Sequence, residues 1–248
     1  MSKILITGGT GKLGRELVKI FPDSLHPSRS ELDITDETAV DNFIKKNLPD
    51  IIIHTAAMTS VRRCEEEKES AWRVNAVGTE NLAKACLAHR PDCYFVYIST
   101  ACVFHGDRGN YVETDLPYPK NFYALTKLIG ECIIEHSGLK RWLVVRTNFV
   151  AREKWPYPKA FIDRYGTYLF SDEVASAIKS VISTNMTGIV HIYGDKKISM
   201  YELAKITTPE VEPMTLAEYN GPPLTIDMSL RSIRIKPFNT YSKEGVMP

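Results

Sequence analysis

The sequence predicts an α/β fold with a doubly wound, mainly parallel sheet and a small C-terminal substrate-binding portion. Short β-branched apolar runs alternate with amphipathic helical stretches along most of the chain, which is typical of parallel sheets covered by helices. The first apolar run leads directly into a glycine-rich turn that opens a helix. The chain has 248 residues, 44% of them hydrophobic, and this is enough for one large domain with its own core.

Each expected strand is a short apolar run. We expect strands at residues 3–7, 24–26, 50–55, 93–98, 142–146 and 189–192, of which 24–26 is the weakest. The expected helices carry apolar residues at helical spacing. They cover residues 12–20, 36–47, 65–89, 122–137, 172–184 and 199–206. Thr35 is the expected cap of the second helix.

We divide the chain into three parts. Residues 1–150 form an expected Rossmann-type portion that binds a dinucleotide and carries the catalytic residues. Residues 151–236 form a reduced substrate-binding portion, interleaved with the last elements of the first part. Four prolines, at positions 209, 213, 222 and 223, mark an irregular stretch within it. Residues 237–248 are expected to be a tail.

Charge and cysteine usage exclude several classes of function. The 31 basic and 30 acidic residues give a net charge of +1, so nothing points to nucleic acid or an anionic membrane. No segment approaches the roughly 20 apolar residues that cross a bilayer, and the first residues lack the pattern of a signal peptide. The five cysteines are scattered without CxxC spacing, so neither a metal site nor a disulfide framework is expected. We expect a cytoplasmic protein with reduced thiols.

The turn TGGTGKLG at residues 7–14 has the spacing of a dinucleotide-binding loop. Its first spaced glycine permits the tight turn, the second lets backbone N–H groups reach a pyrophosphate, and the third lets helix and strand pack closely. A generic glycine-rich loop is the alternative, but the position between strand and helix favours the cofactor. The expected cofactor contacts here are Gly8, Thr10, Gly11, Lys12, Leu13 and Gly14.

Residues after the second expected strand decide which dinucleotide is preferred. An NAD site usually carries an acidic residue about 20 positions beyond the glycine turn, but Ser28, Arg29 and Ser30 stand here. Arg29 would meet a 2′-phosphate, so we predict NADP(H), with NAD(H) as the alternative. A solvated Arg29 at the surface is the other interpretation. Asp33 and Ile34 are expected to border the adenine, although Asp33 equally suits a turn.

Tyr123 and Lys127 lie four residues apart on an expected helix and therefore share a face. An ammonium beside a phenol lowers the phenol's pKa, and such a phenol can exchange a proton with a reacting carbonyl. Thr100 follows a parallel strand, whose carboxyl end faces the ligand crevice, and is our choice for binding the carbonyl oxygen. Ser99 is the second choice or a strand-end cap. The alternative interpretation is that Tyr123 is an ordinary helix residue beside a lysine whose charged end reaches solvent. Taken together with the glycine turn, however, Thr100, Tyr123 and Lys127 predict hydride transfer to or from a carbonyl.

These motifs resemble the extended short-chain dehydrogenase/reductases, in the NAD-dependent epimerase/dehydratase superfamily. Closer detail resembles one branch, the dTDP-4-dehydrorhamnose reductases. The segments that carry this likeness are RSELDITD at 29–36, PDIIIHTAAMT at 49–59, TKLIGE at 126–131, Arg146-Thr147 and DRYGT at 163–167. The likeness covers about residues 3–205.

The resemblance implies an NAD(P)H-dependent reductase of a nucleotide-linked 4-keto-6-deoxysugar. Tyr123 would protonate the C4 oxygen as hydride arrives, Lys127 would bond the nicotinamide ribose and lower the Tyr123 pKa, and Thr100 would align the carbonyl. The implied cofactor contacts outside the glycine turn are Ala56, Ala57, Met58, Asn75, Ser99, Tyr123 and Lys127. The implied substrate contacts are Ala101, Cys102, Val103, Asn148 and Phe149. By analogy, the helices at 65–89 and 122–137 would form a homodimer.

The chain departs from the branch in three places. Ala101 and Cys102 stand where relatives usually have Asp-Tyr, and Phe149 stands where a Trp is expected. The segment 151–162 is short, whereas relatives use a longer one to hold the nucleotide and sugar. The substrate-binding portion is therefore expected to be reduced. The aromatic, proline-rich residues 155–158 are either a substituted substrate lip or a rigid surface loop.

Cys102 has a second interpretation. In the related GDP-fucose synthases, a Cys at this place acts as an acid/base together with a later His. Here only His191 comes later, inside an expected strand, so a small buried Cys is the preferred interpretation. His54 is expected at a strand end and His105 in a loop, neither of them catalytic.

Two other functions stay open. A nucleotide-sugar epimerase or epimerase-reductase would exchange a substrate hydrogen with solvent. A non-catalytic, NADP-binding regulatory subunit is the other alternative, because the β-subunit of methionine adenosyltransferase resembles this same branch. The set of Thr100, Tyr123 and Lys127 favours an enzyme, whereas the shortened substrate region favours the regulatory subunit.

Overall fold

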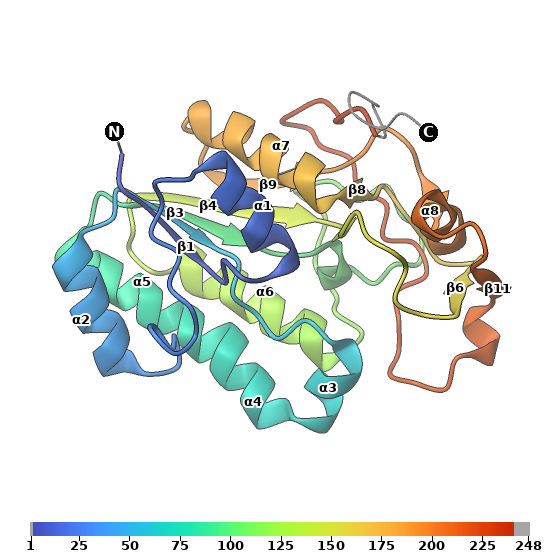
Figure 1. Ribbon diagram of the computed structural model, residues 1–248, viewed down its shortest axis with the longest axis horizontal. Coiled ribbons are helices and arrows are strands. Elements are labelled where there is room, and N and C mark those ends of the chain that lie inside the picture. The colour runs from blue at the N-terminus through green and yellow to red at the C-terminus, as the bar shows by residue number, and fades with distance from the viewer. Residues whose placement is uncertain (1, 241–248) are drawn as a thin grey trace.

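A five-stranded parallel sheet lies between two layers of helices in the computed structural model, which describes residues 2–240 (Figure 1). Neighbouring strands are parallel throughout. Their order across the sheet is β1 (Ile4–Thr7), β2 (Ile51–His54), β3 (Tyr94–Ile98), β4 (Arg141–Thr147) and β9 (Gly188–Ile192). The predicted α/β fold with a mainly parallel sheet is confirmed.

The weak strand predicted at 24–26 is reduced to one parallel bridge between Leu5 and Leu25. Leu25 still exchanges two backbone hydrogen bonds with β1, from its N–H to Ile4 and from Ile6 to its carbonyl, each 2.8 Å long. Pro27 follows almost at once and has no N–H to donate, which stops the ladder.

Helices cover both faces of the sheet (Figure 1). On one face lie α1 (Lys12–Ile20) and α7 (Ser171–Ser183). On the other lie α2 (Glu37–Asn47), α5 (Gly78–His89) and α6 (Phe122–Glu135). Because each strand is buried on both sides, its residues alternate between two cores. Those cores explain why the strands are apolar throughout instead of alternating with polar residues.

The second and third helical stretches differ from the prediction in detail. Asp36, not Thr35, caps α2, because its carboxylate accepts from the Ala39 N–H at 3.0 Å. The expected helix at 65–89 is divided into several pieces. They are α3 (Val61–Glu66), α4 (Lys68–Trp72), a π-helical turn (Arg73–Val77) and α5.

The C-terminal part adds α8 (Met200–Thr207) and pairs of short strands. These pairs are β5 (Phe149–Val150) with β8 (Leu169–Phe170), β6 (Lys159–Phe161) with β11 (Glu212–Met214), and β7 (Tyr165–Gly166) with β10 (Ile198–Ser199). Here β6, β11 and α8 lie beyond the carboxyl ends of the sheet strands, on the right of Figure 1. The sequence predicted a small portion here, but not these strands.

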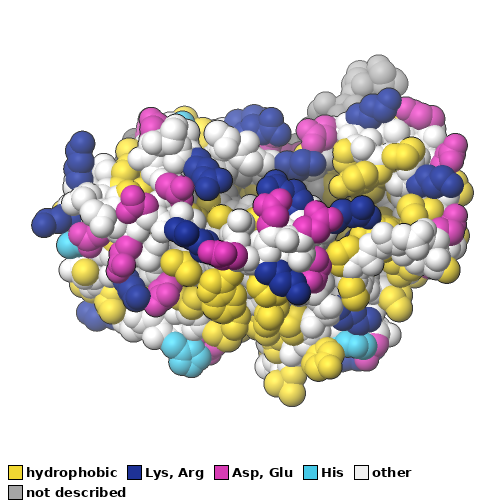
Figure 2. Space-filling model, turned by 90° about the horizontal axis from the view of Figure 1, so that it is seen from below, with side chains coloured by type: hydrophobic (Ala, Val, Ile, Leu, Met, Phe, Trp, Pro, Cys, Tyr) yellow, Lys and Arg dark blue, Asp and Glu magenta, His cyan; other side chains and the backbone are white. Residues whose placement is uncertain are grey.

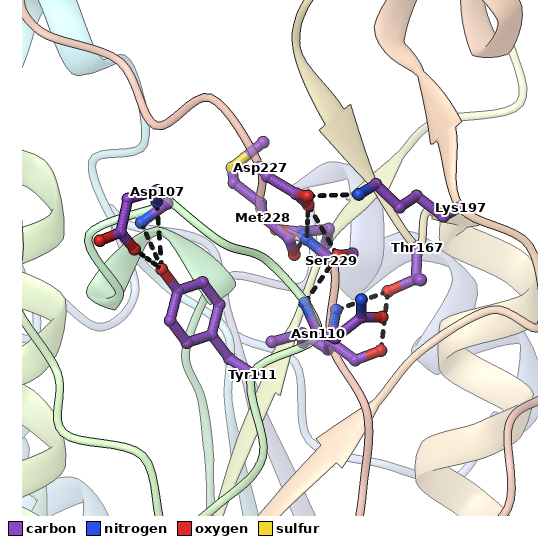
Figure 3. A network of polar contacts seen from close by, with 11 residues as sticks. Asp107, Asn110, Tyr111, Thr167, Lys197, Asp227, Met228 and Ser229 are labelled. Carbon is purple, nitrogen blue, oxygen red and sulfur yellow. Dashed lines mark hydrogen bonds and ion pairs between the residues drawn. The ribbon is translucent and has the colours of Figure 1, made fainter.

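A returning segment, residues 225–231, ties this part to the loop after β3. Tyr111 bridges to Leu230, and the Asp227 N–H donates to Gly106 at 2.9 Å. Figure 3 shows the Asp227 carboxylate between Lys197 and Ser229, with Asn110 bound to Ser229 from the opposite side.

In the predicted tail, the Phe238 N–H donates to Tyr193 at 3.0 Å, and residues 241–248 lie outside the described part of the chain. No helix within residues 2–240 has the length and apolar character that a membrane crossing requires.

Candidate active site

The glycine turn has a backbone that only glycine fits at two positions. Gly8 has φ +72°, and a Cβ there would lie 2.7 Å from the Ala56 nitrogen. A Cβ on Gly14 would lie 2.1 Å from the Gly8 carbonyl oxygen. Gly11 is the N-cap of α1, and its N–H donates to Gly8 at 2.9 Å. This close-packed turn at a helix N-terminus fits a dinucleotide pyrophosphate.

We expect Gly14→Ala to weaken both the fold and cofactor binding. The added methyl must displace the Gly8 carbonyl, and overpacking of this kind costs about 1–3 kcal/mol. Urea unfolding and NADPH titration would measure the two effects. Ser180→Ala is the control, because Ser180 is exposed on α7 and lines neither cavity, so both quantities should stay unchanged. A Gly14→Ala protein with unchanged stability and affinity would contradict the packing role.

Two adjoining cavities run over this turn and share Gly11, Thr55 and Ala57 in their walls. The first has a volume of about 740 Å³. It is lined by nine of the predicted cofactor contacts, namely Gly8, Thr10, Gly11, Arg29, Asp33, Ile34, Ala56, Ala57 and Met58. The second has a volume of about 480 Å³ and extends toward the C-terminal part. Lys12, Leu13 and Gly14 line this second cavity.

The far end of the first cavity combines arginines with carboxylates. Arg29 Nε lies 3.5 Å from Asp33. The N–H and hydroxyl of Thr35 donate to Asp33 at 2.9 and 2.8 Å, and these bonds hold the pKa of the Asp33 carboxyl below its usual value. Arg63 and Arg73 also line this cavity, and neither was predicted from the sequence. They stand on helical segments without a motif, so only the fold brings them there.

Asn75 lies behind the cavity wall and does not line either cavity. It is buried, its side-chain oxygen accepts from the Met58 N–H at 2.7 Å, and its amide donates to the Met58 carbonyl at 3.0 Å. The same amide donates to Thr126 on α6 at 2.9 Å. Asn75 therefore joins the Met58 loop to α6 and holds the cavity wall from behind.

The second cavity brings the predicted catalytic residues together. Thr100, Tyr123 and Lys127 all line it, as does Ser99. Asn121 caps α6 by accepting from the Ala124 N–H at 2.9 Å, which starts the helix so that Tyr123 lies in its first turn. The Thr100 hydroxyl favours the phenolate of Tyr123 and so lowers the pKa of that phenol.

Burial dominates the electrostatics of Tyr123 and Lys127. Burial raises the pKa of Tyr123 well above its usual value, and the Thr100 hydrogen bond opposes this rise only in part. Burial also lowers the pKa of Lys127 to about 7, opposed by the nearby Glu131 charge. The Tyr123 pKa therefore lies above its usual value and not below it as expected, because burial of the phenol dominates and Thr100, not Lys127, is the group that lowers it. Lys127 Nζ instead lies 4.0 Å from the centre of the Tyr97 ring.

A buried ion pair beneath the cavity was not predicted. Arg146 Nη2 donates to Glu131 at 2.7 Å, and both side chains are almost fully buried. The Ser99 hydroxyl also donates to Glu131, so it points away from a ligand even though Ser99 lines the cavity. This network connects strands β3 and β4 with α6.

The predicted substrate contacts divide into two groups. Cys102, Asn148 and Phe149 line the second cavity. Ala101 and Val103 are fully buried and pack into the core behind it, so the structure does not bring them to the cavity.

Residues outside the predicted contacts complete the wall of the second cavity. Trp155, Pro156 and Tyr157 also line it, which places the aromatic loop against the site. Within residues 2–240, no three His, Cys, Asp or Glu side chains gather as a metal site would require.

The histidines considered with Cys102 lie elsewhere. His191 on β9 is buried, and its Nδ1 lies 2.8 Å from the Arg231 carbonyl. His54 bonds through its two ring nitrogens to Thr7 at 2.6 Å and Thr79 at 3.0 Å, and burial lowers its pKa to about 3. Neither histidine lines the second cavity, so the described residues offer Cys102 no histidine partner there.

Comparisons with known proteins agree on one family. The model of the RmlD substrate binding domain matches residues 2–164. The dTDP-4-dehydrorhamnose reductase of Aggregatibacter actinomycetemcomitans is 32% identical, over 82% of this chain and 77% of that protein. The methionine adenosyltransferase 2 subunit beta of Mus musculus is 33% identical, over 99% of this chain and 87% of that protein.

A solved structure shows the same fold. It is a Bacillus anthracis dTDP-4-dehydrorhamnose reductase in complex with NADP. The TM-score is 0.85 and the identity 26%, with 93% of this chain and 90% of that chain covered.

Proposed function

Because this chain belongs to the RmlD substrate binding domain family, we propose that it reduces a nucleotide-linked 4-keto-6-deoxysugar with NAD(P)H. At the level of the family it is an NAD(P)-dependent oxidoreductase that acts on a sugar nucleotide. One observation carries the finer proposal. Thr100, Tyr123 and Lys127 line one cavity that continues over the glycine turn.

In this proposal Tyr123 is the general acid. NAD(P)H, when bound along the glycine turn, supplies the hydride. Because burial raises the pKa of Tyr123, its phenol stays protonated at neutral pH, which is the state that a reductase needs to protonate a forming alkoxide. Thr100, which lines the same cavity as Tyr123, would align the carbonyl. A Lys127 ammonium would offset the phenolate that remains after proton transfer.

We propose NADP(H) as the preferred cofactor, with NAD(H) as the alternative. Three guanidinium groups, from Arg29, Arg63 and Arg73, line the first cavity. Of the two carboxylates there, Asp33 faces Arg29 and Glu67 pairs with Arg63 at 3.0 Å. Planar guanidinium groups bind phosphate through paired hydrogen bonds, so this end suits a 2′-phosphate.

The test is NADPH and NADH consumption with a panel of dTDP-, UDP-, GDP- and CDP-linked 4-keto-6-deoxysugars. Turnover on one sugar, lost in Tyr123→Phe, would support the reductase and identify the nucleotide. Exchange of a substrate hydrogen with deuterated water, without net NADPH consumption, would instead support an epimerase.

A second candidate function is a non-catalytic, NADP-binding regulatory subunit. Its support is the likeness to methionine adenosyltransferase 2 subunit beta along 99% of this chain, together with the short segment at 151–162. Tight NADPH binding without turnover on any sugar of the panel would favour this function over the reductase.

A homodimer formed through α5 and α6 remains part of the proposal. Figure 2 shows hydrophobic side chains gathered on the face seen from below, the side on which α4, α5 and α6 lie in Figure 1. Among the exposed large hydrophobic residues are Trp72 on α4, Leu87 on α5 and Leu125 on α6. Apolar side chains on neighbouring helices support an interface between two copies.

Lys127→Met should change the pH dependence of stability. The folded state lowers the pKa of Lys127 from 10.5 to about 7, so the buried ammonium destabilises the fold below pH 7. As pH rises from 7 toward 10.5, the folded protein has already released this proton, and the penalty disappears. We expect Lys127→Met to be more stable than the native protein at pH 6, with the difference shrinking above pH 7.

Urea unfolding at several pH values would measure this difference. Lys46→Met on the exposed end of α2 is the control and should show the same small difference at every pH. A Lys127→Met difference that does not depend on pH would contradict the prediction.

A further inference from the structure

Arg164 is a buried cation in the wall of the second cavity. It precedes β7, and its side chain lines the cavity together with Cys102 and Tyr123. Its Nε donates to the Thr225 carbonyl at 2.9 Å, and its Nη2 lies 3.4 Å from the Thr225 hydroxyl. The remaining hydrogen-bond contacts of its guanidinium within residues 2–240 are with thioether sulfurs. Met200 lies 3.1 Å from Nη1 and Met228 lies 3.3 Å from Nη2.

The charge of Arg164 is not neutralised by the described part of the chain. Arg146, also buried, pairs with Glu131 at 2.7 Å, but no Asp or Glu in residues 2–240 forms an ion pair with Arg164. A guanidinium stays charged in proteins, thioethers are weak acceptors, and burial of an unpaired charge is costly. The described part of the fold therefore leaves a cation in the cavity wall without a carboxylate partner.

The position of Arg164 is on the substrate side of the reacting groups. The Arg164 guanidinium contacts Met228, and the sulfur of Met228 lies 3.3 Å from the sulfur of Cys102. Cys102 is two residues beyond Thr100, at the carboxyl end of β3. Met228 is held in place, because its carbonyl accepts from Asn148 at 2.8 Å and its neighbours belong to the network in Figure 3. Arg164 lines only the second cavity, whose wall also holds the predicted substrate contacts Cys102, Asn148 and Phe149.

We propose that Arg164 is a specificity residue that binds an oxyanion of the substrate, the sugar-side phosphate of a nucleoside diphosphate. The planar guanidinium of Arg164 has N–H groups whose acceptors are thioethers, which are weak hydrogen-bond acceptors. A guanidinium can instead pair with two phosphate oxygens through parallel hydrogen bonds. This inference rests on the proposed function in so far as the substrate is a nucleotide sugar. A carboxylate on the sugar itself would offer the same oxyanion chemistry.

The test is calorimetric binding of dTDP, UDP and GDP to the NADPH-loaded protein and its Arg164→Gln variant. We expect the tightest of these ligands to lose about 10–100-fold in affinity, the range for a charge-assisted hydrogen bond. The diphosphate affinity of Arg164→Lys should lie between those of the native and Arg164→Gln proteins, because lysine keeps the charge but lacks the planar guanidinium. NADPH affinity should not change. Arg108→Gln is the matched control, because Arg108 pairs with Asp115 outside both cavities.

A structural role predicts a different pattern. If Arg164 only supports the fold, its removal lowers stability, whereas removal of an unpaired buried charge should leave the melting temperature equal or higher. If Arg164→Gln does not fold, Arg164→Lys still decides, because it keeps the charge but lacks the planar guanidinium that pairs with phosphate. Equal diphosphate affinity of the native and Arg164→Lys proteins would overturn the proposal.

Other outcomes would overturn the assignment as well. Equal affinity of the native and Arg164→Gln proteins for all three diphosphates would do so. A different result would be that Arg164→Gln binds UDP and UDP-glucose as the native protein does but loses affinity for UDP-glucuronate. That result would show that Arg164 binds a sugar carboxylate and not the phosphate. These assays do not depend on turnover. A protein that reduces no sugar but loses diphosphate binding in Arg164→Gln would fail the proposed function and still support this inference.

Discussion

Tyr123→Phe is expected to lower kcat by about 10²–10⁴-fold, the usual contribution of general acid catalysis, while NADPH affinity changes little. The substitution removes one hydroxyl from a buried helix residue and leaves the ring in place. Without it, the Thr100 hydroxyl still lines this cavity, but an aliphatic hydroxyl is a far weaker acid than a phenol. Because the hydroxyl acts on the forming alkoxide, the loss should appear in kcat more than in KM.

Stopped-flow measurement of hydride transfer under single-turnover conditions would isolate the chemical step for this variant. Tyr118→Phe is the matched control, since Tyr118 is 65% exposed and lines neither cavity. A Tyr123→Phe protein that transfers hydride at the native rate would remove Tyr123 from the mechanism. The acid would then be sought among the other groups that line the second cavity, with Cys102 the first to examine.

The fold could be predicted from sequence because local patterns determine it. The β-branched runs and the helical spacing predicted all five sheet strands within about one residue, and α1 begins and ends where expected. The glycine turn was predictable for a similar reason, since Gly8 is required by its own positive φ and Gly14 by contact with Gly8, a few residues earlier in the chain. The segment at 24–26 failed because one leucine between polar residues and a proline holds only a bridge.

The rest of the site depends on contacts between distant parts of the chain. Arg63 and Arg73 reach the first cavity because α3 and the π-helical turn fold beside it, and no motif marks them. Arg164 meets Met228 across 64 residues, and the segment that carries Met228 showed no periodic pattern. The pKa of Tyr123 was predicted in the wrong direction because spacing shows the neighbouring ammonium but not the depth of burial.

The ion pair between Glu131 and Arg146 should have the largest effect on stability. We expect Arg146→Met to lower the free energy of unfolding by about 3–5 kcal/mol, because it leaves a buried carboxylate without its partner. The pair itself contributes far less than this, since desolvation of both charges offsets most of their attraction. The double variant Glu131→Leu with Arg146→Met should therefore recover most of the loss. Urea unfolding of the four proteins gives the coupling energy directly.

The exposed pair of Glu80 and Lys84 on α5 is the matched control, and its removal should cost less than about 1 kcal/mol. The buried pair also bears on catalysis. The Glu131 charge raises the pKa of Lys127, so Glu131→Gln should lower that pKa further and leave less ammonium beside Tyr123 at neutral pH. A double variant as unstable as the sum of its single variants would show that Glu131 and Arg146 act independently. The link from this network to Lys127 would then be unsupported, because it requires the carboxylate to be held in place by the arginine.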